Sequence, residues 1–148
     1  MKTIAPVLFS ALWISSGFAQ DLPAAKDKEL VESVCTACHN NARIFRSNKG
    51  TDDWKSTVDR MVNKGANADD EQVKSILVYL NKYFGPRVNM NKAEANDLQA
   101  QLDLSAEEAA AIVKYRTDSG NFKAIEDLQK VTGLDFAKMR LFENRLDF

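Results

Sequence analysis

The sequence predicts an all-α protein made of two small domains. Apolar residues recur at spacings of three and four along most of the 148 residues, whereas the alternation typical of strands is scarce. The pair Gly85-Pro86 ends one such helical pattern, and the character of the sequence changes after it. We therefore expect one domain over residues 20–86 and a second over residues 87–148.

Residues 1–19 have the features of a secretory signal peptide. Lys2 is followed by an apolar run, Ile4–Ile14, and then by small residues that end at Ala19. That run is shorter than the about 20 residues that a membrane-spanning helix needs, which leaves a retained interfacial anchor as the alternative. We expect cleavage before Gln20, export to the periplasm and no membrane span in the mature protein.

Charge is evenly balanced in this chain. Its 20 basic and 21 acidic side chains give a net charge of −1. Such a composition lacks the basic footprint that binding to nucleic acid or to an anionic membrane requires. Composition therefore indicates neither partner.

The only two cysteines and the only histidine of the chain stand together as Cys35, Cys38 and His39. A disulfide or a redox dithiol is natural in an oxidising compartment, but neither uses the histidine, and no βαβ pattern surrounds the pair. A structural zinc site normally needs four ligands, and the chain has three such residues. The third interpretation is one covalently attached haem c, with a thioether from each thiol and His39 as the proximal iron ligand. Cys-x-x-Cys-His is the attachment signature for that cofactor, so this is the interpretation we expect.

Residues 22–86 resemble a small class I cytochrome c around this motif. Leu30 and Val34 lie four residues apart and predict a helix that leads into it. A second helix is predicted over residues 69–84, with acidic residues at its start and Gly85 after its end. The resemblance implies that these two helices cross and hold the haem between them.

The sixth iron ligand is predicted to be a methionine, since no second histidine is present. We expect Met61, which shares a helical face with Trp54, although a helical methionine is also an ordinary core side chain. Met90 is the alternative ligand. Trp54 is expected to pack near the haem. Arg43 and Arg46 are expected either to pair with its propionates or to be ordinary surface arginines.

The remainder of the chain carries a series of motifs at fixed offsets. It opens with Val-Asn-Met-Asn at residues 88–91, where Met90 takes an apolar position. The series continues with Ile112-Val113, Tyr115-Arg116, Gly120, Phe122 and Glu126-Asp127-Leu128. Over residues 88–146 it resembles the tandem helix-hairpin-helix module of the competence DNA-receptor family, also seen in an extrinsic subunit of photosystem II. The resemblance implies a compact helical fold with two hairpins.

The two expected hairpins differ from those of DNA-binding members, which present Gly-x-Gly turns whose backbone N–H groups meet phosphate. The corresponding segments here are Leu102-Asp103-Leu104-Ser105 and Gly133-Leu134-Asp135-Phe136. We expect Asp103 and Asp135 to repel phosphate, and from Arg87 onward the chain has nine basic and eleven acidic residues. A modest basic cluster, interpreted as a solvated face, consists of Lys114, Arg116 and Lys123. Nucleic acid is therefore not the expected partner.

The function predicted from these features is electron transfer by a periplasmic monohaem c-type cytochrome. We expect a carrier, or the electron-transfer subunit of a larger oxidoreductase, that is not an enzyme by itself. Its partner would be a dehydrogenase or a terminal acceptor, with the helix-hairpin-helix module as the docking unit. Two alternatives stay open: a DNA-binding helix-hairpin-helix adaptor that carries haem, and a haem with an open site that senses or converts a ligand.

Overall fold

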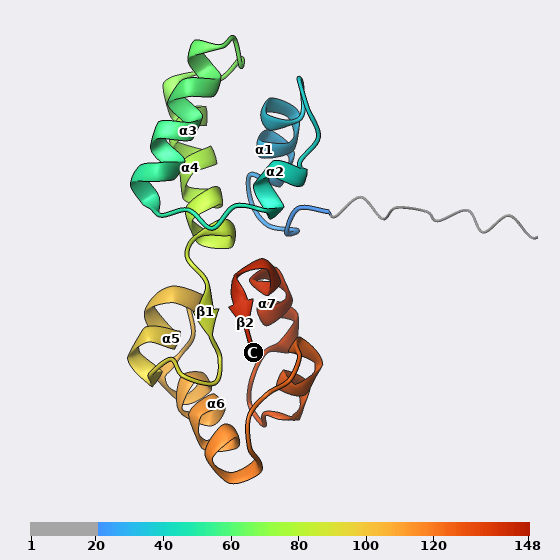
Figure 1. Ribbon diagram of the computed structural model, residues 1–148, viewed down its shortest axis with the longest axis vertical. Coiled ribbons are helices and arrows are strands. Elements are labelled where there is room, and N and C mark those ends of the chain that lie inside the picture. The colour runs from blue at the N-terminus through green and yellow to red at the C-terminus, as the bar shows by residue number, and fades with distance from the viewer. Residues whose placement is uncertain (1–20) are drawn as a thin grey trace, which may run out of the picture.

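The structure, a computed structural model, describes residues 21–148 as two helical units that lie end to end (Figure 1). The predicted signal peptide and its cleavage site before Gln20 lie outside the described residues. The expectation of a mostly helical protein is confirmed for the described part of the chain. None of the helices described there has both the length and the apolar character that crossing a bilayer requires.

The N-terminal unit is built around its last and longest helix. Its elements are α1 (Lys28–Cys35), α2 (Ala42–Phe45), α3 (Thr51–Asn63) and α4 (Asp70–Phe84). Helix α4 packs against both α1 and α3, and Figure 1 shows it reaching the boundary with the second unit. The side chains that are most deeply buried between these helices include Val31, Trp54, Ile76, Leu80 and Phe84. The helices predicted to lead into and to follow the cysteine motif are therefore both present.

The two ends of α4 have clear physical causes. At its start, Asp69 accepts from the backbone N–H of Gln72, and the Gln72 side chain accepts from the backbone N–H of Asp69, which makes a capping box. The helix ends before Gly85, whose φ of −70° any residue can adopt. The glycine is required for space instead, because a Cβ there would lie 2.5 Å from the carbonyl oxygen of Asn81.

The C-terminal unit begins and ends with two short strands that pair with each other. Strand β1 (Val88–Asn89) lies parallel to β2 (Leu146–Asp147), with Val88 opposite Leu146. The backbone N–H of Met90 extends the pairing by donating to the carbonyl of Asp147 at 2.8 Å. This contact joins the first and last segments of the unit and closes it.

Between the strands lie two helical pairs, each joined by a tight hairpin. The elements are α5 (Ala95–Leu102), α6 (Ala106–Ser119), the 3₁₀ helices η1 (Ile125–Lys130) and η2 (Glu143–Arg145), and α7 (Phe136–Leu141). Fully buried side chains fill the space between them: Met90, Leu98, Leu102, Ile112, Leu128 and Met139. The first helix of the second pair is a 3₁₀ helix, and the Asp127 carboxylate ties its start by accepting from the N–H groups of Lys123 and Ala124.

Candidate functional site

A cavity of about 380 Å³ opens in the N-terminal unit, within the size range of small-molecule and cofactor sites. Much of its lining is apolar and comes from α1 to α4: Val34, Ile44, Trp54, Val58, Ile76 and Leu80. The helices that the sequence predicted around the cysteine motif therefore enclose a space rather than a closed core.

The predicted cofactor residues meet at this cavity. Cys35, Cys38, His39 and Met61 all line it, and neither cysteine forms a disulfide. Burial raises the pKa of the Cys35 thiol. The imidazole Nδ1 of His39 lies 2.9 Å from the carbonyl oxygen of Asn40, which leaves the opposite ring nitrogen as its other polar atom. Their roles in haem attachment and iron ligation stay predictions.

Only some of the other predicted haem residues line the cavity. Trp54 and Arg43 line the cavity, whereas Arg46 is exposed and is not part of its lining. Met90, the alternative ligand, is fully buried in the core of the C-terminal unit. Among residues 21–148, no three His, Cys, Asp or Glu side chains form a cluster that could hold a bare metal ion.

Basic side chains surround the apolar part of the cavity. Arg43, Lys49, Arg60 and Lys64 contribute to its lining, and no aspartate or glutamate does. The Lys49 ammonium donates to Thr57 Oγ1 at 2.9 Å and lies 5.6 Å from the centre of the Trp54 ring. An apolar interior with a cationic edge fits a flat apolar group that carries carboxylates, as haem does with its propionates. Sequence reasoning missed Arg60 and Lys64, although Arg60 precedes Met61 on α3 and Lys64 directly follows the end of that helix.

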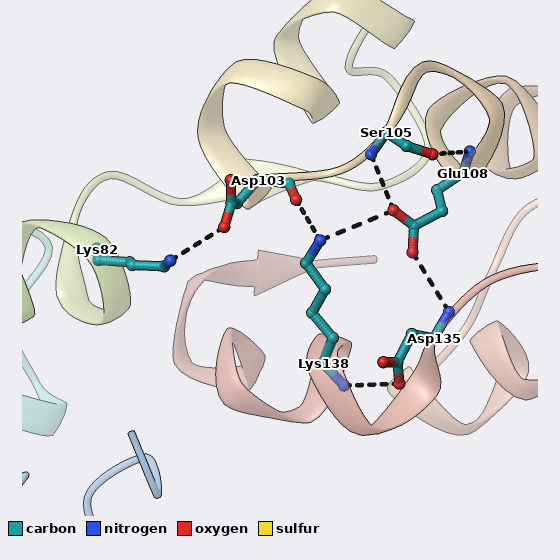
Figure 2. Close-up of polar contacts among 6 residues, drawn as sticks. All are labelled: Lys82, Asp103, Ser105, Glu108, Asp135 and Lys138. Carbon is teal, nitrogen blue, oxygen red and sulfur yellow. Dashed lines mark hydrogen bonds and ion pairs between the residues drawn. The ribbon is translucent and has the colours of Figure 1, made fainter. Parts of the chain in front are cut away.

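The first hairpin joins α5 to α6 and is capped by its own side chains (Figure 2). Asp103 takes the left-handed conformation, with φ of 57°, at the position where a glycine is common. Ser105 then caps α6: its Oγ accepts from the N–H of Glu108 at 3.1 Å, and its own N–H donates to Glu108 Oε2 at 2.8 Å. The hydrogen bond from the backbone N–H of Ser105 holds the pKa of Glu108 below its ordinary value.

The second hairpin joins η1 to α7 and is also capped by a carboxylate. Gly133 has φ of 85°, and a Cβ built there would meet no heavy atom within 4 Å. The Asp135 carboxylate accepts from the backbone N–H of Lys138 at 3.1 Å. The backbone N–H of Asp135 in turn donates to Glu108 Oε1 at 3.5 Å, so a residue of the first helical pair reaches the second hairpin.

Lys138 joins the two hairpins in the centre of Figure 2. Its ammonium donates to the carbonyl oxygen of Asp103 and lies 3.7 Å from Glu108 Oε2. The Asp103 carboxylate faces the other way and accepts from Lys82 of α4 at 3.0 Å. That hydrogen bond lowers the pKa of Asp103. The negative charge at the first hairpin is therefore partly compensated by a lysine that the sequence places 21 residues away.

The expected basic cluster of the C-terminal unit is only in part a solvated face. The guanidinium of Arg116 donates to the carbonyl oxygens of Met90 and Ala93, both at 2.7 Å, and holds the loop after β1. Lys114 is paired with Asp118 on its own helix. The interpretation as a solvated face fits Lys114 and Lys123, which are exposed, but not Arg116, because a half-buried arginine that donates to backbone carbonyls is not visible from spacing alone.

Comparison with known families decides the nature of the C-terminal unit. Residues 84–146 match the family described as the helix-hairpin-helix motif. Residues 84–146 form a helix-hairpin-helix domain. The match begins at Phe84, the last residue of α4, and ends at Leu146, the first residue of β2, so it contains β1 and both hairpins.

Curated relatives match about a third of this chain. The ComE operon protein 1 of Bacillus subtilis is 40% identical over 50 residues, which are 34% of this chain and 24% of that protein. The rat and mouse proteins named endonuclease/exonuclease/phosphatase family domain-containing protein 1 are each 40% identical over 52 residues, 35% of this chain and 9% of theirs. The aligned segment thus spans about a quarter of the bacterial relative and about a tenth of the mammalian ones. No solved structure matches the chain at a significant level.

These findings overturn the predicted electron-transfer function. The matching family covers residues 84–146, and neither it nor the relatives support a cytochrome c, a haem protein or an electron carrier. The alternative of a DNA-binding helix-hairpin-helix protein is the one that they favour. The prediction gave the five-residue cysteine motif more weight than the 63-residue domain behind it. It also treated Asp103 as an unpaired charge, which the contact with Lys82 corrects.

Proposed function

We propose that the helix-hairpin-helix domain binds duplex DNA through its two hairpins. The observation that carries the proposal is the fixed pairing of these hairpins, which Lys138 and Glu108 hold together within a domain of the matching family. Similarity to the ComE operon protein 1 supports it, given the resemblance of the same residues to competence DNA receptors. Duplex DNA presents phosphates at regular spacing, so a rigid pair of turns is a suitable partner for it.

The second hairpin offers the more open approach to a phosphate. Gly133 leaves space on its outer side, since no atom lies within 4 Å of a Cβ placed there. A backbone without a side chain allows a ligand to come close to the N–H groups of the turn. Phosphate contacts of this kind carry no sequence information, so the binding is expected to be independent of sequence.

The caps of both hairpins limit the affinity. The Asp135 carboxylate accepts from the backbone N–H of Lys138, and the Glu108 carboxylate accepts from that of Ser105, so both compete with phosphate for donors at a helix start. Lys82 compensates Asp103, whereas the ion pairs found among residues 21–148 include none with the Asp135 carboxylate. We therefore expect weak binding, with a Kd of about 10⁻⁴–10⁻⁶ M at physiological salt.

Removing the charge at the second hairpin tests this function. Asp135→Asn keeps a side chain that can cap α7 but loses its negative charge. We expect the variant to bind a labelled duplex several times more tightly than the parent chain in fluorescence anisotropy. Asp97→Asn, an exposed carboxylate in the first turn of α5 at the opposite end from the hairpin, is the matched control and should leave the affinity unchanged. Equal effects of the two changes would show that overall charge, and not the hairpin, controls binding.

We also propose that one haem c is attached through Cys35 and Cys38, with His39 and Met61 as the iron ligands. The support is the cavity that these four residues share, its apolar interior and its four cationic side chains. When bound, the group would supply an iron centre within the N-terminal unit, while Arg43 and Lys49 would hold its carboxylates. This proposal goes with export of the chain to the periplasm.

Mass spectrometry tests the attachment directly. The full chain, expressed together with a c-haem maturation system, should gain the mass of one haem, and a Cys35→Ala/Cys38→Ala variant should not. A Met61→Ala variant should keep the added mass and change the visible spectrum, because only the distal ligand is lost. A parent chain without any covalent adduct would contradict the proposal and leave DNA binding unaffected.

A further inference from the structure

A buried arginine lies at the boundary between the two units. Arg145 is 5% exposed, and its guanidinium donates to three backbone carbonyl oxygens. The distances are 3.0 Å to Pro86, 2.8 Å to Lys82 and 2.9 Å to Gln101. A charged side chain in such a place needs these partners, because burying it without them is costly. Removal from water lowers the pKa of Arg145, in agreement with its position.

The three carbonyls come from two segments, both far from Arg145 in the sequence. Lys82 lies in the last turn of α4, Pro86 in the linker, and Gln101 in the last turn of α5. Carbonyls at helix ends lack intrahelical partners and favour a cation. By satisfying two helix ends at once, Arg145 fixes the end of α4 beside the start of the first hairpin.

A second contact joins the same two places. The side chain of Lys82 donates to the carboxylate of Asp103, as Figure 2 shows. Lys82 thus contacts Arg145 through its carbonyl oxygen and the first hairpin through its ammonium group. The next residue, Tyr83, packs on Phe142 with 5.5 Å between the ring centres. The position of the first hairpin therefore depends on the last turn of α4.

The same turn of α4 is tied to the wall of the cavity. Trp54 lines the cavity, and its Nε1 donates to the carbonyl oxygen of Phe84 at 3.0 Å in a buried hydrogen bond. The following residue, Gly85, is so tightly enclosed that a Cβ would lie 3.4 Å from Arg145 Cζ and closer still to Asn81. Contacts thus run without interruption from the cavity wall to the first hairpin.

We propose that Lys82, Phe84, Gly85 and Arg145 form a joint that couples the cavity to the first hairpin. Through this joint, a change at Trp54 alters the position of Asp103 and the affinity for DNA. Arg145 is the positioning residue of the joint. The consequence for DNA rests on the proposed function, whereas the coupling itself can be measured without DNA. The cationic edge of the cavity belongs to the cofactor site already described, and this joint gives that site a connection to the hairpins.

Hydrogen exchange of the full mature chain tests the coupling. Trp54→Phe keeps an aromatic ring in the cavity wall but removes the indole N–H that donates to the carbonyl oxygen of Phe84. We expect the amides of the first hairpin, residues 101–109, to exchange about tenfold faster in this variant. The second hairpin, residues 131–138, serves as the internal reference. Val58→Ala, in the same cavity wall, is the control and should not act selectively on the first hairpin.

Selective acceleration by Trp54→Phe supports the proposal. It is overturned if residues 101–109 exchange at the parent rate, or if Val58→Ala accelerates them equally. Lys82→Gln, an exposed position where misfolding is not expected, provides a second test. This variant lacks the contact between Lys82 and Asp103. When Trp54→Phe is added to it, the effect on hydrogen exchange of the first hairpin should be smaller than in the parent chain. An undiminished effect would contradict the assigned path.

The DNA assay separates the two proposals. If Trp54→Phe accelerates the hairpin amides but no variant binds duplex DNA, the proposed function fails and the coupling stands. If the parent binds DNA and Trp54→Phe changes neither exchange nor affinity, the coupling fails and the function stands.

Discussion

The cavity of the N-terminal unit and the helix-hairpin-helix domain use their basic side chains in opposite ways. Around the cavity, Arg43, Lys49, Arg60 and Lys64 form no ion pair with any carboxylate among residues 21–148. In the helix-hairpin-helix domain, most basic side chains are engaged: Arg87, Lys114, Lys130 and Arg140 with carboxylates, Arg116 and Arg145 with carbonyls, and Lys138 with both.

The difference shows that a balanced net charge does not reveal which cationic side chains are paired within the protein. The cavity is free to attract an anionic ligand, because its cations are not neutralised by the protein. The hairpin domain instead uses its cations to hold itself together, so phosphate must compete with internal partners. The following changes test whether this division is real, starting with the largest expected effect.

Replacing Arg145 should have the largest effect on stability. Arg145→Met leaves the carbonyls of Pro86, Lys82 and Gln101 without their buried donor. We expect the free energy of unfolding to fall by about 3 kcal/mol, as urea denaturation would measure it. Arg140→Met in the same domain is the matched control, and it should cost less than about 1 kcal/mol because its ion pairs are exposed. Similar losses in both variants would contradict the role of Arg145.

Gly85→Ala should come next, because the joint has no room for a methyl group. The added Cβ would lie 2.5 Å from the carbonyl oxygen of Asn81. We expect a loss of about 2 kcal/mol in the free energy of unfolding from the forced shift. At Gly50 the nearest heavy atom is 4.0 Å away, so Gly50→Ala should cost less than about 1 kcal/mol, mainly through the changed cap of α3. An equal cost at both sites would show that the joint can relax.

The hairpin caps should give a smaller effect that separates capping from charge. Asp135→Ala removes the side chain that accepts from the N–H of Lys138 and should cost about 1 kcal/mol in the free energy of unfolding. Asp135→Asn keeps a capping group and should lower the free energy of unfolding by only about 0.3 kcal/mol. Both variants lose the charge, so both should bind duplex DNA more tightly if they stay folded. A stability loss of the same size in Asp135→Asn would mean that charge, and not capping, stabilises α7.

Glu108 should make stability depend on pH in the acid range. Its pKa in the folded protein lies below its ordinary value of 4.5, chiefly through the backbone N–H of Ser105. The ionised form is thus favoured by folding, and this stabilisation is present above pH 4.5. It is lost as the pH falls through the lower pKa of the folded state. Glu108→Gln should flatten this part of the stability curve, and an unchanged curve would exclude Glu108 as its source.

Several elements could be predicted from the sequence because their signals are local. Leu30 and Val34 placed α1, and the acidic start with Gly85 after the end placed α4 within one residue of its observed bounds. The two hairpins lie at the positions that the resemblance implied, between α5 and α6 and before α7. Local periodicity and capping were sufficient for these elements because each depends on neighbours within a few residues.

The features that the sequence did not reveal depend on contacts between distant residues. Val88 pairs with Leu146, and Lys82 neutralises Asp103, but no local pattern connects these positions. Arg145 reads as an ordinary surface residue near the C-terminus, although it is buried against carbonyls of both units. Counting charges in the hairpin segments therefore overestimated the repulsion at Asp103 and helped to lead the predicted function away from DNA.

The most direct test of the account is a salt titration of DNA binding. The full chain would be titrated against a labelled duplex by fluorescence anisotropy, from about 25 to 200 mM salt. The account predicts measurable binding at the low end, with an affinity that falls linearly on a logarithmic scale as a few counterions are released. Absence of binding at the lowest salt, in the parent chain and in Asp135→Asn alike, would contradict the proposal that the hairpins bind DNA.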